Sequence, residues 1–160
     1  MIAVLADTHM PKGNRRLPER CVEAIATAEA VIHAGDFFAV SALEEVRALC
    51  PVVHAVHGNV DEPQLQRSLP AVLEIELGGS IVAITHDAGP AKGRVTSLRR
   101  RFPSAAAVVF GHSHLPLHEF EGDFQIFNPG SPTERRRAPR PSMGLLEPRE
   151  SGLAFEHLWL

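Results

Sequence analysis

The sequence predicts one α/β domain in which a parallel sheet is followed by a substantial antiparallel part. Short aliphatic runs alternate with amphipathic helical stretches in the first half of the chain, and hairpin patterns dominate the second half. No repeat and no low-complexity linker divides the chain, and 44% hydrophobic with 22% charged residues is typical of a globular domain. We therefore expect a single domain over residues 1–160.

The first half is expected to form a parallel sheet with helical crossovers. Its pattern predicts strands over Ile2–Ala6, Val31–Ala34 and Val52–Val56, and helices over Pro18–Glu29 and Val40–Leu49. Successive strand-helix-strand units join parallel strands by right-handed crossovers, so these three strands should lie in one sheet.

The second half is expected to contain a substantial antiparallel part. Apolar and charged residues alternate over Val72–Leu77, and Gly78-Gly79-Ser80 then forms a turn into Ile81–Thr85, which predicts a hairpin. The elements expected after it are a basic helix over Gly93–Phe102, a strand over Ala105–Phe110, a hairpin around Glu121-Gly122-Asp123, and strands near Met143–Leu146 and Leu153–Leu158.

The composition excludes several classes of protein. A formal net charge of −3 leaves no basic footprint, so we expect no nucleic-acid partner. Two cysteines cannot build a disulfide framework or a thiolate zinc site, and the sequence shows no signal peptide and no membrane-length apolar run. We expect a cytoplasmic protein without a membrane partner. Tyrosine is absent, which excludes tyrosyl catalysis.

Residue types that ligate metals follow five of the expected strands, at the point where each strand ends. The turns are Asp7-Thr8-His9, Gly35-Asp36, Gly58-Asn59, His86-Asp87 and Gly111-His112-Ser113-His114. Ligands of α/β sheets bind at the carboxyl ends of strands, so the five turns should converge on one site.

The ligand set that these turns offer contains oxygen and nitrogen but no thiolate. It comprises Asp7, Asp36 and Asn59 with four of the nine histidines, His9, His86, His112 and His114. Seven ligands are too many for one tetrahedral zinc ion. They suit two divalent ions that share a bridging carboxylate, with Mn²⁺, Ni²⁺, Fe²⁺ and Zn²⁺ as the candidates.

In order and combination, these turns resemble the motifs of the calcineurin-like metallophosphoesterases, specifically their small single-domain bacterial and archaeal phosphodiesterase branch. Asp61 and the later Asn128-Pro129-Gly130-Ser131-Pro132 belong to the same match, which spans about residues 1–132. The resemblance implies a four-layer αββα sandwich of two mixed β-sheets flanked by helices. It also implies that Asp7, His9, Asp36 and His114 hold one metal, and that Asp36, Asn59, His86 and His112 hold the other.

The function that the resemblance implies is hydrolysis of phosphodiester bonds in a small phosphate-ester substrate by a hydroxide bound to both metal ions. The residues expected to act in catalysis are Asp36, Asn59, Asp61 and His112. The alternative is a non-catalytic scaffold of the same fold for protein interaction, like the phosphoesterase-like subunit of the retromer coat. Competent residues at all seven ligand positions favour the enzyme.

Three residues beside the ligand turns are expected to contact the substrate: Arg15, His57 and Asp87. Asp87 stands where the family usually has glycine, and two interpretations are open, since it can orient a ligand imidazole or cap the Gly89-Pro90 turn. Val60 replaces a histidine that in many relatives protonates the leaving group. We therefore hypothesise that the enzyme prefers good leaving groups.

The other histidines and apolar side chains are expected to be structural or superficial. His33 should pack or hydrogen-bond near the site. The residues expected at the surface or in an interface are His54, His118 and His157, and the exposed strand residues Phe120, Phe124 and Phe127 would suit a homo-oligomer.

The sequence also contains two arginine-rich runs. Arg99-Arg100-Arg101 ends a helix, where cations complement the helix dipole, so a solvated face is expected. Glu134-Arg135-Arg136-Arg137 lies near the rim of the expected site, where a contact with phosphate is one interpretation.

Overall fold

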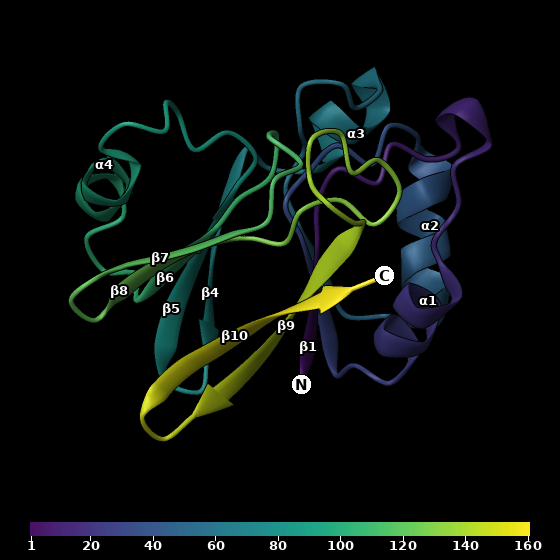
Figure 1. The fold of residues 1–160 in the computed structure, drawn as a ribbon. Helices are drawn as coiled ribbons and strands as arrows, with labels where there is room; N and C mark the ends of the chain where they lie inside the picture. The colour runs from purple at the N-terminus through teal and green to yellow at the C-terminus, as the bar shows by residue number, and fades with distance from the viewer.

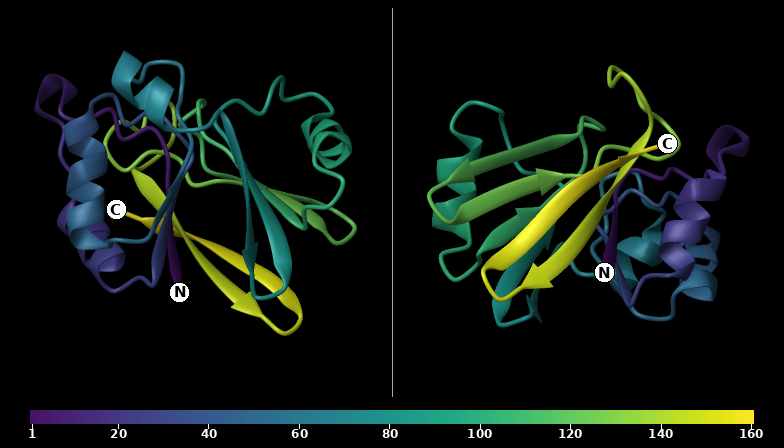
Figure 2. Two further views of the ribbon diagram at one scale, coloured as in Figure 1. Left: turned by 180° about the vertical axis from the view of Figure 1, so that it is seen from behind. Right: turned by 60° about the horizontal axis from the view of Figure 1, so that its bottom comes forward.

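The computed structural model describes residues 1–160 and contains two five-stranded mixed β-sheets that lie face to face, with helices on both outer sides (Figures 1 and 2). The first sheet has the order β10-β9-β1-β2-β3, with the bounds Gly152–Trp159, Ser142–Arg149, Ile2–Leu5, Ala30–His33 and Val53–Ala55. The second has the order β4-β5-β6-β8-β7, with the bounds Val72–Leu77, Ser80–Thr85, Ala107–Val109, Phe124–Asn128 and Leu117–Glu121. The predicted αββα sandwich is confirmed.

The helices cover the outer faces of the two sheets. Their bounds are Glu19–Ala26 for α1, Val40–Leu49 for α2, Pro63–Ser68 for α3 and Arg94–Arg101 for α4, and a short 3₁₀ turn covers Lys12–Asn14. Apolar side chains of α1, α2 and α3 form one core cluster with the first sheet, and Leu98 of α4 joins a second cluster with the other sheet. None of the helices combines the length and the apolar character that crossing a bilayer would require.

The strand pairing agrees with the expected parallel and antiparallel parts. Strands β1, β2 and β3 are parallel neighbours, as the alternating pattern of the first half predicts. Strands β4 and β5 form the expected antiparallel hairpin, whose turn is Gly78-Gly79 with both residues at positive φ. Strand β9 pairs antiparallel with β1, so the last hairpin completes the first sheet.

Helix α1 is shorter than expected, and the reason is local. Its expected range, Pro18–Glu29, is cut at the end by Thr27, whose hydroxyl donates to the carbonyls of Glu23 at 2.9 Å and Ala24 at 3.3 Å. A threonine that bonds back to the preceding turn competes with further helical hydrogen bonds. Helix α3 was not expected, because six residues are too few to show a helical period.

Two phenylalanines of β8 are buried, one between the sheets and one on the face that α4 covers, which corrects their expected exposure. Phe127 is fully buried and stacks on Phe155 at 4.7 Å between ring centroids, and Phe124 is only 4% exposed. Strand β8 is covered on both faces, by the first sheet and by α4, so neither residue is available to an interface. Phe120 on the edge strand β7 is 63% exposed, as expected.

Two histidines expected at the surface are likewise partly enclosed. The ring of His157 stacks on Phe127, and its Nε2 donates to the backbone carbonyl of Asn128 at 2.8 Å. His118 shares a 2.9 Å hydrogen bond with Gln125. His54 is half-buried on β3.

Replacing Gly144 with alanine should destabilise the protein. A Cβ at this position would overlap Cε1 of Phe127 and lie 2.9 Å from its Cζ, inside the tightest part of the core. Overpacking of this kind costs about 1–3 kcal/mol, and we expect the free energy of unfolding in urea to fall by that amount. The control is Gly79→Asn, because nothing lies within 4 Å of a Cβ there and asparagine tolerates positive φ. An unchanged urea midpoint for Gly144→Ala would contradict this account of the core.

Candidate metal centre

The five polar turns meet where the loop edges of the two sheets adjoin. Asp7 and His9 follow β1, Asp36 follows β2 and Asn59 follows β3, all in the first sheet. The second sheet supplies the remaining ligands, His86 after β5 and the pair His112 and His114 after β6. The convergence expected from the sequence is therefore present, with each sheet contributing part of one cluster.

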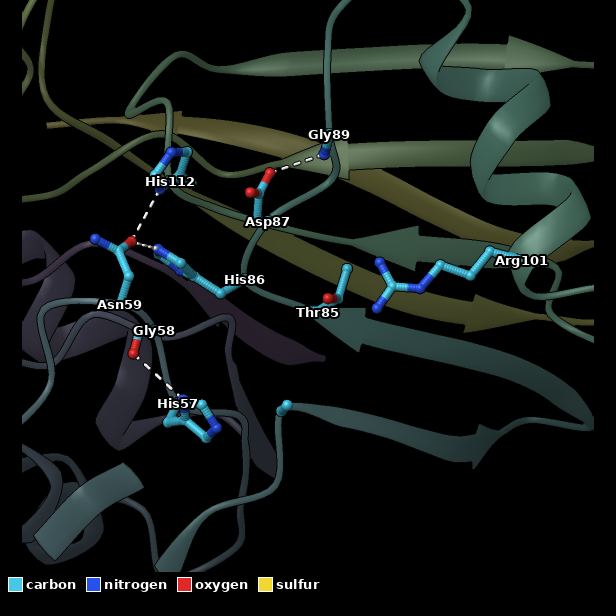
Figure 3. Close-up of a pocket in the computed structure, with 10 residues that line it drawn as sticks. His57, Gly58, Asn59, Thr85, His86, Asp87, Gly89, Arg101 and His112 are labelled. Carbon is cyan, nitrogen blue, oxygen red and sulfur yellow. Dashed lines mark hydrogen bonds between the residues drawn. The ribbon is translucent and has the colours of Figure 1, made fainter. Parts of the chain in front are cut away.

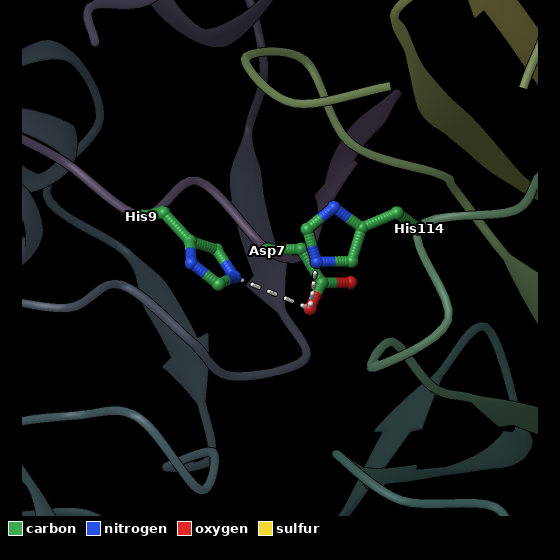
Figure 4. Close-up of side chains that lie close together, drawn as sticks. All are labelled: Asp7, His9 and His114. Carbon is green, nitrogen blue, oxygen red and sulfur yellow. Dashed lines mark ion pairs between the residues drawn. The ribbon is translucent and has the colours of Figure 1, made fainter. Parts of the chain in front are cut away.

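One buried group contains Asp7, His9 and His114 (Figure 4). Oδ1 of Asp7 lies 3.8 Å from Nε2 of His9 and 3.5 Å from Nε2 of His114. Both imidazoles thus turn the same ring nitrogen toward one carboxylate oxygen, and all three side chains are shielded from solvent.

A second group, of which Asp36 and His86 are buried, adjoins it through Asp36. Oδ2 of Asp36 lies 3.2 Å from Nε2 of His86 and 3.5 Å from Nε2 of His9, so this carboxylate faces both groups. Oδ1 of Asn59 lies 3.1 Å from Nε2 of His86 and 3.0 Å from Nδ1 of His112. All seven ligand residues expected from the sequence are therefore in one continuous cluster.

Backbone carbonyls fix the orientation of two of these imidazoles. Nδ1 of His114 lies 2.7 Å from the carbonyl of Glu134, and Nδ1 of His86 lies 2.8 Å from that of Ala34. A carbonyl only accepts, so Nδ1 carries the proton and donates in both rings. In each neutral ring the lone pair is then on Nε2, the atom that faces the aspartates. Partners of this kind commonly orient histidines that ligate metals.

The residues present fit a divalent cation. Three buried atoms of the first group have no hydrogen-bond partner: Oδ2 of Asp7, Nε2 of His9 and Nε2 of His114. Carboxylate oxygens and imidazole lone pairs directed at one another repel unless a cation or a proton lies between them. The donor set of carboxylate, imidazole and amide without thiolate suits a first-row divalent ion.

The pKa values reflect the same concentration of charge. Burial alone would raise the pKa of Asp36, but His86 and His9 outweigh it and hold that pKa well below its usual range. Burial would lower the pKa of His9, whereas hydrogen bonds and charges from Asp36 and Asp7 raise it to about 9. The pKa of His86 is raised in the same way against its burial, chiefly by Asp36. For His114, burial prevails and lowers the pKa.

The backbone at the ligands is strained. Five of the seven ligand residues have positive φ without being glycine: Asp7 at 56°, His9 at 47°, Asp36 at 61°, His112 at 68° and His114 at 60°. Such conformations cost free energy and persist where the surrounding structure over-determines them, typically at functional sites. These conformations turn the side chains of the ligand residues toward the centre at the points where the strands end.

Asp61 lies beneath the ligand loops and does not line the open cavity. Its carboxylate accepts backbone N–H groups from Asp36 at 3.1 Å, Phe38 at 2.7 Å and Gly58 at 2.7 Å. Burial raises its pKa, and the N–H donors of Gly58 and Phe38 oppose that rise. The structure thus gives Asp61 the geometry of a residue that ties the Asp36 turn to the Asn59 turn.

A cavity of about 520 Å³ opens beside the second group (Figure 3). Its lining includes the ligand residues Asn59, His86 and His112, and also His57 and Asp87, two of the three residues expected to contact substrate. Of the two interpretations of Asp87, the structure shows the cap, because Oδ1 accepts the N–H of Gly89 at 2.8 Å.

Arg15, the third expected substrate contact, does not line the cavity. Its guanidinium instead pairs with Glu134 at 3.1 Å, and the other oxygen of Glu134 lies 3.7 Å from Nδ1 of His9. Glu134 therefore acts on both histidines of the first group, through its carboxylate on His9 and its carbonyl on His114. Its place at the start of an arginine-rich run gave no sign of this role.

His33 has the supporting position expected for it. It is fully buried, stacks on Phe37 at 3.5 Å, and its two ring nitrogens engage the Thr8 hydroxyl and the Gly35 N–H, each at 3.2 Å. Burial lowers the pKa of His33 to about 3, so the ring is neutral and serves as a hydrogen-bonding support for the Asp7 and Asp36 turns.

Replacing Gly58 with alanine should weaken metal binding with a smaller effect on the rest of the fold. A Cβ at Gly58 would overlap Oδ1 of Asp36 and lie 2.6 Å from its backbone nitrogen, so the carboxylate would have to move. We expect the affinity for Mn²⁺, measured by calorimetry, to fall by at least about tenfold. Gly79→Asn, in the distant β4–β5 turn, is the matched control and should bind like the native protein. Equal affinities for Gly58→Ala and the control would refute the assignment of Asp36 as a ligand.

Comparisons with known proteins agree with this site and fold. The model of the calcineurin-like phosphoesterase superfamily domain matches residues 1–151. A probable metallophosphoesterase of Methanothermobacter thermautotrophicus is 32% identical over 139 residues, which cover 85% of this chain and 79% of that protein. Among solved structures, an archaeal phosphodiesterase has a TM-score of 0.74 at 21% identity and covers 98% of this chain and 99% of its own.

A second solved structure extends the likeness of fold. Vps29 of Entamoeba histolytica, solved in complex with zinc, has a TM-score of 0.77 at 22% identity and covers 99% of this chain and 98% of its own. The match to the family model across nearly the whole chain, together with the archaeal relative, shows that this protein belongs to the calcineurin-like phosphoesterase superfamily.

Proposed function

We propose that this protein hydrolyses phosphodiester bonds in small phosphate esters with the help of two divalent metal ions. The observation that carries the proposal is the position of Asp36, whose carboxylate faces two adjoining groups of ligands, one of which is buried and the other of which opens on a cavity. One group alone would suit a single structural ion. Two groups that share a carboxylate beside an open cavity suit catalysis.

The residues that would hold the ions follow from the two groups. Asp7, His9, His114 and Asp36 would hold one ion, and Asp36, Asn59, His86 and His112 would hold the other. When bound, two divalent ions supply Lewis acidity, which lowers the pKa of a water nucleophile and neutralises charge on the phosphoryl oxygens. Mn²⁺, Ni²⁺, Fe²⁺ and Zn²⁺ are compatible with this donor set.

The protein's own residues position the reacting groups. Asn59 and His112 lie on the cavity wall with His57, so an ester placed there contacts imidazole and amide groups. Asp61 is a positioning residue, because it fixes the backbone of the Asp36 and Asn59 turns and touches no reacting atom. Asp36 is itself held by the N–H of Val60, which donates to its Oδ1 at 3.0 Å.

Two similarities of fold support this proposal. The archaeal phosphodiesterase with the same fold is described as an enzyme of this class, and the Entamoeba Vps29 structure holds zinc. A small phosphate ester suits a cavity of about 520 Å³, which is within the usual size of small-molecule sites. We further propose that the protein acts in the cytoplasm, in keeping with its two buried free cysteines.

A non-catalytic scaffold is the second candidate, and the similarity to Vps29 is the observation that favours it. The retained ligand set argues for the enzyme, because a scaffold has no need for strained backbone and seven ligand side chains around one centre, five of them buried. Absence of turnover with every metal tested would favour the scaffold.

Replacing Asp36 or His86 with alanine should abolish metal-dependent hydrolysis. The assay uses a chromogenic bis-aryl phosphate diester with Mn²⁺, Ni²⁺ or Zn²⁺ against a chelated sample. We expect a loss of at least about 100-fold in kcat/KM, since each variant removes a ligand. Asp123→Ala in the exposed β7–β8 turn and His54→Ala on β3 are the matched controls. Full activity in folded Asp36→Ala or His86→Ala would contradict the proposal.

The hydrolysis rate should depend steeply on the leaving group. Val60 occupies a position beside the cavity residue Asn59 and offers no proton, so poor leaving groups depart without help from this side chain. Over a series of aryl and alkyl diesters we expect kcat to fall by on the order of 100-fold as the alcohol becomes less acidic. Val60→His should flatten the series. A flat series in the native protein would show that another general acid operates.

A further inference from the structure

Arg101, the last residue of α4, lines the wall of the cavity at the candidate metal centre (Figure 3). The sequence predicted that the end of this helix is a solvated face. The three arginines there are exposed, as expected, and the side chain of Arg101 also extends from α4 toward Thr85, the residue that precedes the ligand His86 (Figure 3). The cavity thus has imidazole and amide groups at one end and a guanidinium at another.

The guanidinium of Arg101 has no carboxylate partner. Arg99 on the same helix pairs with Glu121 at 3.7 Å, and Arg15 pairs with Glu134 at 3.1 Å, but no acidic group lies within ion-pair distance of Arg101. The guanidinium carbon of Arg101 lies 4.9 Å from the centroid of the Phe102 ring. The guanidinium makes no hydrogen bond to another residue, so its donors are free to bind a ligand.

The acidic side chain of the same cavity does not neutralise Arg101. Asp87 is engaged by the N–H of Gly89. The other lining residues are His57, Gly58, Asn59, Ala71, Thr85, Gly89, His86 and His112, none of which carries a carboxylate. Arg101 is therefore the one arginine or lysine on the cavity wall, and it is open to a negatively charged ligand.

The cavity also has room for more than the phosphodiester group itself. A site of about 520 Å³ belongs to the range that holds whole small molecules. If the phosphodiester lies against Asn59, His86 and His112, one ester arm has room to extend along the wall toward Arg101. The end of that arm would then meet a guanidinium.

We propose that Arg101 binds a second anionic group of the substrate, so that the preferred substrates are phosphodiesters with a carboxylate or a further phosphate on one ester arm. This inference rests on the proposed function and adds the substrate class. Arginine presents a planar fork of donors that matches either oxyanion in a bidentate pair, which lysine or glutamine cannot reproduce. Arg101 is thereby a specificity-determining residue that touches the substrate away from the reacting bond.

The test measures binding separately from hydrolysis. Two monoesters of 4-nitrobenzylphosphonic acid serve as probes. Their nitrobenzyl group is joined by a P–C bond, which is not hydrolysed, so binding is measured without release of this group. They differ only at the end of the alkyl arm, which carries a carboxylate in one and the isosteric carboxamide in the other. Their affinities for the Mn²⁺-loaded protein are measured by calorimetry for the native chain, Arg101→Gln, Arg101→Lys and the control Arg100→Gln, which changes an exposed arginine outside the cavity lining.

The native protein should bind the carboxylate probe about tenfold more tightly than the carboxamide probe, since Arg101 is solvent-accessible and its ion pair is partly screened. Arg101→Gln should abolish this preference and leave the affinity for the carboxamide probe unchanged. Arg101→Lys should keep part of the preference for the carboxylate probe, and Arg100→Gln should keep all of this preference. Raising the salt concentration from about 0.05 to 0.5 M should reduce the native protein's preference for the carboxylate probe.

Three outcomes would overturn the proposal: no preference in the native protein, a preference that survives in Arg101→Gln, or no binding of either probe. The proposed function is judged separately, by turnover of the corresponding 4-nitrophenyl phosphate diesters. A preference for the carboxylate probe without any turnover would refute the hydrolase and leave Arg101 as an anion-binding residue. Turnover at equal kcat/KM for both diesters would refute the role of Arg101 and leave the hydrolase.

Discussion

Two carboxylates buried next to each other impose the main constraint on this structure. Asp7 and Asp36 follow neighbouring strands, and neither is more than 3% exposed. Burying anions is costly unless cations or hydrogen-bond donors face them. Histidines from both sheets supply those partners, so the two halves of the sandwich meet through this polar cluster as well as through their apolar faces. The raised pKa of His9 and the depressed pKa of Asp36 are two expressions of this one constraint.

The strained backbone and the crowding around the ligands follow from the burial of these two carboxylates. Side chains must reach one centre from several strand ends, and positive φ at the ligand residues is how the backbone turns them inward. Such conformations cost about 1 kcal/mol or more each. Gly58 lies so close to Asp36, and Gly111 to Asp7, that neither position has room for a methyl group. The apolar layer between the sheets, to which Phe127 of β8 belongs, must therefore hold the loops in place.

The sequence predicted the ligands well because each follows a short buried strand, and parallel strands must end at one edge of a sheet. It failed where contacts join distant segments or where periodicity misleads. Phe124 on β8 was expected to be exposed, but it packs in a core cluster with α4 and is buried. The arginines at the end of α4 are exposed, as the sequence predicted, but only the fold shows that Arg101 also lines the cavity. The contacts of Glu134 with Arg15 and His9 depend on how two loops meet, which no local pattern records.

The strand order of the first sheet has a consequence for the synthesis of the chain. Strand β1 lies in the middle of its sheet, with β2 on one side and β9 on the other. Pairing with β2 becomes available once residue 33 has left the ribosome, whereas β9 begins only at residue 142. Through most of translation one edge of β1 is thus open, and such edges are templates for pairing with other chains. The risk of aggregation is set by how long the ribosome takes to reach β9, and the stability of the finished fold does not reduce that interval.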